Sequence, residues 1–309
     1  MAYAIDPELA AAVHMLPEVD LTDLSAVRAL MADHVREAEV DETGVTVTER
    51  ATTRADGTDL TLRVYRPDDA APAAILAVHG GGFVIGSIDA DHGRNVRLAR
   101  QTGAVVVAVG YRLAPETPFP GGLEDCYAGL EWLAANAVEL GVDPDRIAVN
   151  GHSAGGGLCA ALALLARDRG GPRIRFQFLG VPEVDDRLET RSARHFVDTP
   201  VWDRRRAEIS WDCYLGPGRR GGPDVSPYAA PARAEDLTGL PPAYVSAMEF
   251  DPLRDEAVAY AVRLMDAGVP VELHVFSGTF HGSVLVEHAQ QAQRELEEEV
   301  VVLRRALGL

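Results

Sequence analysis

A serine in a glycine-flanked turn is the first feature of this sequence that could do chemistry. Gly151, Ser153 and Gly155 fit the pattern G-x-S-x-G. The apolar run at 147–149 predicts a short buried strand, and the sequence that follows predicts an apolar helix over 154–169. A serine on a sharp strand-to-helix turn projects its hydroxyl from a sheet edge, where the helix dipole favours developing negative charge. The alternative is a glycine-rich turn with an incidental serine, and the strand and helix around it favour a nucleophile.

A run of three glycines follows another apolar strand, in the sequence HGGGF at 79–83. Consecutive glycines favour neither strand nor helix, and they let backbone N–H groups approach a ligand closely. Acyl transfer needs such donors about 3 Å from the oxyanion of its tetrahedral intermediate. We expect the N–H groups of Gly80, Gly81 and Ala154 to form this oxyanion hole. A dinucleotide-binding loop is excluded for two reasons. Its glycine spacing is one residue shorter than the spacing found here, and such a loop requires an acidic residue on a second strand.

A nucleophilic serine needs a base, and that base needs a carboxylate to orient it. When the nucleophile lies mid-chain, the acid is expected after a later strand and the histidine after the strand that follows. Asp251 comes after the strand-like run at 243–247 and is the predicted acid. The same side chain could instead cap the helix predicted over 252–267, and Glu249 is held in reserve.

Three histidines lie downstream of this acid. The pattern places His274 inside a strand and His288 inside the C-terminal helix, where packing or surface roles explain them. His281 lies in the loop between those two elements and is the predicted base, against the alternative of a structural loop histidine. His152, beside the nucleophile, is expected to pack or hydrogen-bond rather than to act as the base, since adjacent side chains point in different directions.

Short apolar strands separated by helices surround these residues. Strand-like runs occupy 45–49, 60–65, 74–78, 105–109, 147–149, 174–179, 243–247 and 271–276. From residue 74 onward, helical segments are predicted at 89–102, 122–140, 154–169, 252–267 and 283–306. This alternation predicts an α/β fold with a mostly parallel sheet covered on both faces. The first two runs have no helix between them and predict an antiparallel edge hairpin.

One insertion breaks the alternation between the sixth and seventh strands. It is rich in Asp, Arg, Gly and Pro, and it is longer than a connection requires. We expect residues 1–40 and about 185–225 to form a helical cap on a catalytic domain spanning 41–309. A solvated surface excursion is the alternative, and three aromatic residues in the insertion favour the cap: Trp202, Trp211 and Tyr214.

Composition excludes several classes of protein. A formal charge of −18 over 309 residues would repel nucleic acid. All 29 basic residues are arginine, which excludes a phosphate loop that requires lysine. No signal peptide and no apolar run long enough for a membrane span is evident, so we expect a cytoplasmic protein without membrane attachment. The sequence permits a homodimer. Three widely spaced cysteines are expected to be reduced packing residues rather than metal ligands: Cys126, Cys159 and Cys213.

Several blocks together resemble the hormone-sensitive-lipase-like family of α/β-hydrolases, the bacterial carboxylesterases with an HGGG loop. They are HGGGF at 79–83, YRLAPETPFP at 111–120, EDCYAGLEWL at 124–133, DPDRIAVNGHSAGGGL at 143–158, DPLRDE at 251–256 and FHG at 280–282. The resemblance implies an eight-stranded sheet, a cap and no cofactor. Matched residue by residue, the resemblance implies a catalytic triad of Ser153, Asp251 and His281. It also implies an oxyanion hole formed by Gly80, Gly81 and Ala154.

The sequence therefore predicts a serine carboxylesterase that hydrolyses short- to medium-chain acyl esters through an acyl-enzyme on Ser153. A lactonase, an amidase or a dehydratase on the same scaffold is the alternative, and a non-catalytic ligand-binding protein is a further one. The predicted partner is a small-molecule ester.

Overall fold

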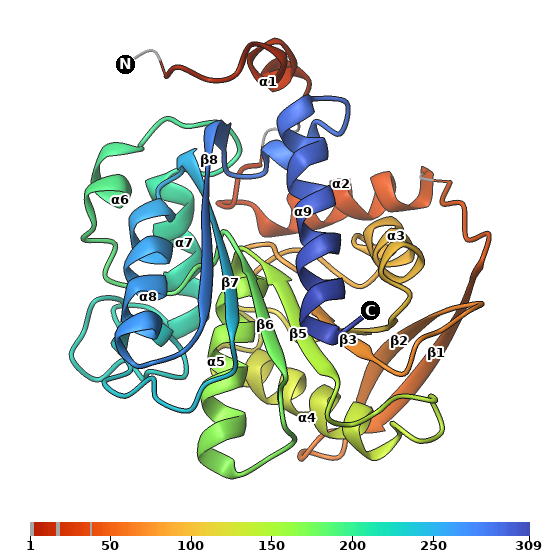
Figure 1. The fold of residues 1–309 in the computed structure, drawn as a ribbon. Coiled ribbons are helices and arrows are strands. Elements are labelled where there is room, and N and C mark those ends of the chain that lie inside the picture. Colours follow the sequence, from red (N-terminus) through yellow and green to blue (C-terminus); the bar gives the residue numbers. More distant parts are fainter. Residues whose placement is uncertain (1–2, 17–18, 38) are drawn as a thin grey trace.

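The computed structural model describes residues 3–16, 19–37 and 39–309, shown as a ribbon in Figure 1. Within these residues, eight strands form one sheet in the order β1-β2-β4-β3-β5-β6-β7-β8. The pairs β1–β2 and β2–β4 are antiparallel, and the other neighbours are parallel. The predicted α/β fold, its mostly parallel sheet and its edge hairpin are confirmed. The strands are β1 (Val45–Thr53), β2 (Asp59–Pro67), β3 (Ala74–Val78), β4 (Val105–Val109), β5 (Ile147–His152), β6 (Phe176–Gly180), β7 (Ala243–Phe250) and β8 (Val271–Phe280).

The order of the strands brings the two glycine motifs together. Strand β3 lies between β4 and β5, so the chain first builds the sheet on one side of β3 and then returns to its other side. In an open parallel sheet, such a reversal creates a crevice at the carboxyl ends of the two strands. The HGGGF loop follows β3 and Ser153 follows β5, so both motifs lie at this switch point.

Helices cover both faces of the sheet because successive strand residues alternate between two apolar cores. On β3, Ala74, Leu76 and Val78 join one core, while Ile75 and Ala77 join the other. Burial on both faces explains the uninterrupted apolar runs in the sequence. The first core is filled by α4 (Gly121–Ala135), α5 (Ala154–Arg169) and α8 (Arg254–Asp266), and the second by α3 (His92–Thr102) and α9 (Gln290–Leu307).

Strands β7 and β8 are longer than the sequence predicts. The apolar pattern ends at residues 247 and 276, yet the two strands continue to Phe250 and Phe280, which pair with each other after an irregularity at Met248. The polar sequence after residue 276 and the irregular pairing before Phe280 hide this extension. As a result, Asp251 and His281 each come directly after a strand.

Two distant parts of the chain meet above the carboxyl ends of the strands. The first contains α1 (Pro7–Ala12) and α2 (Leu24–Glu37), and the second contains α6 (Arg191–His195) and α7 (Arg204–Leu215), as Figure 1 shows. Arg28 of α2 donates to the carbonyl of Val84, just after the glycine loop, at 2.8 Å. Arg206 of α7 donates to the carbonyl of Val19 at 2.8 Å and so joins the two parts.

On these contacts we propose that residues 1–40 and about 185–225 act together as a cap on the catalytic domain at 41–309. Residues 1–2, 17–18 and 38 of the first segment lie outside the described residues. No helix in the described part of the chain is long and apolar enough to cross a membrane.

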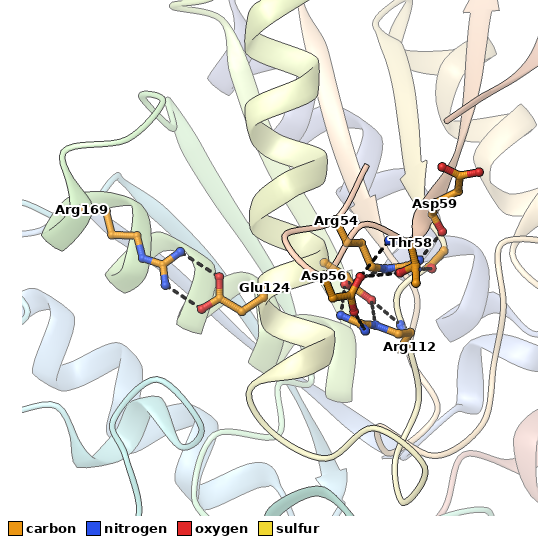
Figure 2. Close-up of polar contacts among 9 residues, drawn as sticks. Arg54, Asp56, Thr58, Asp59, Arg112, Glu124 and Arg169 are labelled. Atoms are coloured by element: carbon orange, nitrogen blue, oxygen red, sulfur yellow. Dashed lines mark hydrogen bonds and ion pairs between the residues drawn. The ribbon is translucent and has the colours of Figure 1, made fainter. Parts of the chain in front are cut away.

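A buried carboxylate on α4 joins this helix to the edge hairpin β1–β2 and to the segment after β4. Asp125 is 1% exposed and accepts from Arg54 Nε at 2.9 Å and from Arg112 Nε and Nη2 at 2.9 and 2.8 Å. Arg54 directly follows β1 and Arg112 follows β4, so the Asp125 carboxylate joins α4 to the segments after two strands. Figure 2 shows both arginines beside the hairpin turn at Asp56, which Arg112 also contacts. The Asp125–Arg112 contact therefore gives the sequence blocks at 111–120 and 124–133 a structural role away from the site.

Replacing this carboxylate should cost far more stability than replacing its neighbour. Asp125→Ala leaves two arginines without their buried partner and should lower the free energy of unfolding by about 3–5 kcal/mol. Glu124 pairs with Arg169 instead (Figure 2), and both side chains are about 40% exposed, so Glu124→Ala should cost only about 0–1 kcal/mol. Urea denaturation followed by circular dichroism measures both. Equal losses for the two variants would contradict this account of the hairpin.

Candidate active site

The backbone at Ser153 is strained, and only its glycine neighbours permit it. Ser153 lies between β5 and α5 with φ +57° and ψ −125°, a conformation that costs a residue with a side chain on the order of 1–3 kcal/mol. A Cβ on Gly151 would lie 2.3 Å from the carbonyl oxygen of Gly155, and a Cβ on Gly155 would lie 2.2 Å from that of Val78. The chain can therefore turn sharply enough to expose the Ser153 hydroxyl at the helix N-terminus.

Asp251, His281 and Ser153 form a continuous hydrogen-bonded series. His281 Nδ1 lies 2.7 Å from Asp251 Oδ2, and His281 Nε2 lies 3.0 Å from Ser153 Oγ. Because an ionised carboxylate only accepts, Nδ1 carries the proton and Nε2 is left free to accept from the serine hydroxyl. This arrangement can remove the hydroxyl proton as the serine attacks an electrophile.

Asp251 is oriented by the backbone rather than used as a helix cap. It is fully buried, and its Oδ1 accepts from the Leu253 N–H at 2.8 Å. Helix α8 begins at Arg254, two residues later than predicted, so the alternative role of Asp251 as its N-cap is not realised. The reserve candidate Glu249 lies in β7, where its carboxylate accepts from Ser277 Oγ and Gly278 N instead of from His281.

Two other histidines, His274 and His152, contact carboxylates of α9 instead of the serine hydroxyl. His288 is predicted inside the C-terminal helix, but α9 begins after it, at Gln290. His274 Nδ1 is 2.7 Å from a carboxylate oxygen of Glu298 on α9. The ring of His152 is directed toward α9, with Nε2 3.3 Å from the buried Glu299 Oε1. Burial lowers the pKa of His152, which favours the neutral ring. The structure thus places His152 in a packed hydrogen-bonding position, as the sequence analysis expects.

The glycine loop lies against the nucleophile turn. A Cβ on Gly80 would lie 2.9 Å from the carbonyl oxygen of His152 and 3.6 Å from Ser153 Cβ. Gly81 has φ +114°, and its carbonyl accepts from the N–H of Val84 and of Ile85, which folds the loop back on itself. Such close contacts explain why consecutive glycines occur here.

The predicted oxyanion donors lie on the glycine loop and on the turn at Ser153. Among the described residues, the N–H groups of Gly80 and Gly81 donate to no protein acceptor. Ala154 is the first residue of α5, so its N–H is one of the donors that a helix leaves without an internal partner. Three free N–H groups on two facing turns could therefore stabilise an oxyanion.

The segment between β6 and β7 closes over these groups. The Trp202 ring centroid lies 5.6 Å from that of His281, and a Cβ on Gly82 would lie 2.6 Å from the Trp202 ring. Ser153 and His281 are 8% and 6% exposed, so the charges of a reacting group would be little screened by water.

Two buried polar residues of the site are missed by the sequence analysis. Ser210 of α7 lies 2.9 Å from the Gly82 carbonyl oxygen and 3.0 Å from Glu183 Oε1. Glu183 is fully buried, and desolvation raises the pKa of its carboxyl to about 8. Its backbone N–H donates to the Ser153 carbonyl at 3.1 Å. The available signal was an acidic residue within the apolar sequence LGVPEV after a core strand, but sequence alone gives no partner for it.

Comparisons with known proteins agree with this geometry. The model of a family described as having the alpha/beta hydrolase fold matches residues 75–285. Carboxylesterase NlhH of Mycobacterium tuberculosis is 42% identical over 248 residues, covering 76% of this chain and 75% of that protein. Esterase LipI of the same species is 41% identical over 218 residues, covering 71% and 68%.

Solved structures show a similar likeness over almost the whole chain. The structure of Bacterial Heroin Esterase is 51% identical, with a TM-score of 0.94 and 98% of both chains covered. Esterase LipW from Mycobacterium marinum is 37% identical, with a TM-score of 0.90, covering 98% of this chain and 96% of that one.

Nucleophile reactivity separates Asp251 from Glu249. Asp251→Asn should slow reaction of Ser153 with an alkyl fluorophosphonate by roughly 10²–10⁴-fold, because an amide favours the wrong imidazole tautomer. Glu249→Gln, the matched control, should leave the rate nearly unchanged. Mass spectrometry of the intact protein over time gives both rates. A larger loss in Glu249→Gln would transfer the role of acid to Glu249.

Proposed function

Because the chain belongs to the hormone-sensitive-lipase-like family of α/β-hydrolases, we propose that it is a serine carboxylesterase with the triad Ser153, Asp251 and His281. The observation that carries the proposal is His281, whose two ring nitrogens lie 2.7 and 3.0 Å from the acid and the hydroxyl. The esterase names of its relatives support the same class of substrate.

In the first half of the reaction, Ser153 Oγ attacks the ester carbonyl carbon while His281 Nε2 takes the hydroxyl proton. The carbonyl oxygen becomes an oxyanion, which accepts from the N–H groups of Gly80, Gly81 and Ala154. When the intermediate collapses, the C–O bond to the alcohol breaks and His281 returns the proton to the leaving oxygen. Asp251 stabilises the transient imidazolium and remains ionised throughout.

In the second half, water replaces the serine as the nucleophile. His281 accepts a proton from water as it attacks the acyl-enzyme, and the same N–H donors hold the second oxyanion. Collapse releases the carboxylic acid and returns the proton to Ser153. Since both halves use the same base and donors, no further titrating group is required.

Activity measurements distinguish the alternatives on this scaffold. A lactonase or amidase would prefer a lactone or a p-nitroanilide over the matching ester, and a dehydratase would turn over none of them. A ligand-binding protein would bind an ester without releasing alcohol. The hydrogen-bonded series favours catalysis over ligand binding alone, because His281 can take the Ser153 proton.

The proposal is tested by Ser153→Ala and p-nitrophenyl butyrate. The variant should fold normally and lose at least ~10³-fold in kcat, as deletions of triad residues do. Steady-state release of p-nitrophenol measures the loss, and circular dichroism checks the fold. Retention of most of the activity in the folded variant would remove Ser153 from the reaction.

The residues that cover the site limit the length of the acyl chain that it can bind. Trp202 lies beside His281, and Phe83, the residue after Gly82, stacks on Tyr214 at 4.0 Å between ring centroids. The covering segment at 185–225 is dominated by arginine, aspartate and glycine, which a lipid surface would not bury. We therefore assign short- to medium-chain esters as substrates rather than long-chain triglycerides.

A series of p-nitrophenyl esters from two to sixteen carbons tests this limit. Each methylene that meets apolar wall contributes about 0.8 kcal/mol, or roughly a fourfold rise in kcat/KM. We expect kcat/KM to rise to about four to eight carbons and then to fall once the wall ends. A continued rise to sixteen carbons, or activation by an oil–water interface, would instead indicate a lipase.

A further inference from the structure

A buried serine bridges the glycine loop and a buried carboxyl group. Ser210 on α7 is fully buried, as is Glu183, which lies just after β6. The Ser210 oxygen is 2.9 Å from the Gly82 carbonyl oxygen and 3.0 Å from Glu183 Oε1. Neither residue has a role in the reaction derived above, yet both contact the turns that carry it.

The number of available protons determines the direction of each hydrogen bond in this bridge. A serine hydroxyl has one hydrogen, and a backbone carbonyl can only accept. If Ser210 donates to Gly82, then Glu183 must donate to Ser210 and must carry a proton. If Glu183 is ionised, it can only accept, and a charged acceptor forms the stronger bond with Ser210. The Gly82 carbonyl then loses the one donor it has among the described residues.

Assuming the proposed esterase activity, we propose that protonated Glu183 positions the oxyanion hole by holding Ser210 in the orientation that anchors Gly82. Gly82 follows Gly81 directly, so the anchor fixes the loop that carries two of the three oxyanion donors. The other end of the relay is equally close to the reaction, because the Glu183 N–H donates to the Ser153 carbonyl. Glu183 and Ser210 are therefore positioning residues, and neither contacts the reacting atoms.

The surroundings of Glu183 favour its neutral form. The charge of Asp251, after β7, acts on Glu183, and Glu183 in turn acts on Glu256 of α8 and Tyr214 of α7; none of these three groups is a cation. Glu183 Oε2 is buried with no partner among the described residues, which costs far less for a neutral carboxyl than for a carboxylate. Burial and the charge of Asp251 raise the pKa of Glu183 to about 8.

The direction of the pH effect follows from this pKa. The anchored, protonated form predominates below about pH 8, and the anchor is lost as the pH rises through that value. Displacing an oxyanion donor by about 1 Å costs on the order of 10²-fold, so kcat should fall on the alkaline side. KM should change much less, since the oxyanion exists only in the transition state and intermediates.

The test is the pH profile of kcat for p-nitrophenyl butyrate, corrected for spontaneous hydrolysis, in three variants. Glu183→Gln supplies a permanent amide donor to Ser210, so it should keep nearly the kcat measured at pH 7 and lose the alkaline fall. Ser210→Ala removes the anchor at every pH, so kcat should drop by roughly 10- to 100-fold and become flat on the alkaline side. Glu256→Gln is the matched control, because Glu256 is also buried with a raised pKa, yet its carboxyl accepts from two backbone N–H groups and, among the described residues, from no side chain.

An unchanged alkaline fall in both Glu183→Gln and Ser210→Ala would overturn the inference, as would its loss in Glu256→Gln alone. If Glu183→Gln failed to fold, Ser210→Ala would still decide, because full kcat in that variant would show that no anchor is needed. Failure of the proposed function is a separate result: the wild-type protein would then release no p-nitrophenol at any pH.

Discussion

The contact between the ends of β3 and β5 is the constraint on which the rest of the site depends. Gly155 packs against the carbonyl of Val78, and Gly80 packs against that of His152, at distances that no Cβ could tolerate. This contact brings the oxyanion loop to the nucleophile turn and holds Ser153 in its strained conformation. Because neighbouring parallel strands are about 4.8 Å apart, two loops at their ends meet only if their backbones lack side chains there. The two glycine motifs are therefore two halves of one interface.

Because the site is closed to water, the protonation state of each buried acid depends on the groups around it. Asp251, Glu183 and Glu256 are all buried near the carboxyl ends of β6 and β7, and the charge of Asp251 raises the pKa of Glu183 while that of Glu183 raises the pKa of Glu256. The Asp251 carboxylate contacts His281 and a backbone N–H, whereas the one partner of the Glu183 carboxyl among the described residues is the Ser210 hydroxyl. Burial raises the pKa of Glu183 and of Glu256, so these two acids are held closer to neutral beside the residue that orients the base.

Much of the fold and of the candidate site could be predicted because local signals specify them. The glycine pattern around Ser153 reflects contacts within two turns, and the apolar runs reflect strands buried on both faces. The ends of β7 and β8 could not be predicted, since the pairing is irregular after Met248 and Phe276 and resumes only at Phe250 and Phe280. Glu183 and Ser210 were missed for a related reason. The apolar sequence around Glu183 marks it as buried, but its partner Ser210 is brought to it only by the return of α7 over the sheet.

The same return of the chain links the choice of substrate to the chemistry. Val201 has φ +62°, an unfavourable conformation for a β-branched residue, and it directs the following Trp202 between Gly82 and His281. Ser210, one helical segment later, contacts the same glycine. A segment that touches both the oxyanion loop and the base cannot change shape without moving groups that act in the transition state. Substitutions in the part of the chain from Val201 to Ser210 should therefore alter kcat as well as KM, whereas a cover that only lined the pocket would alter binding alone.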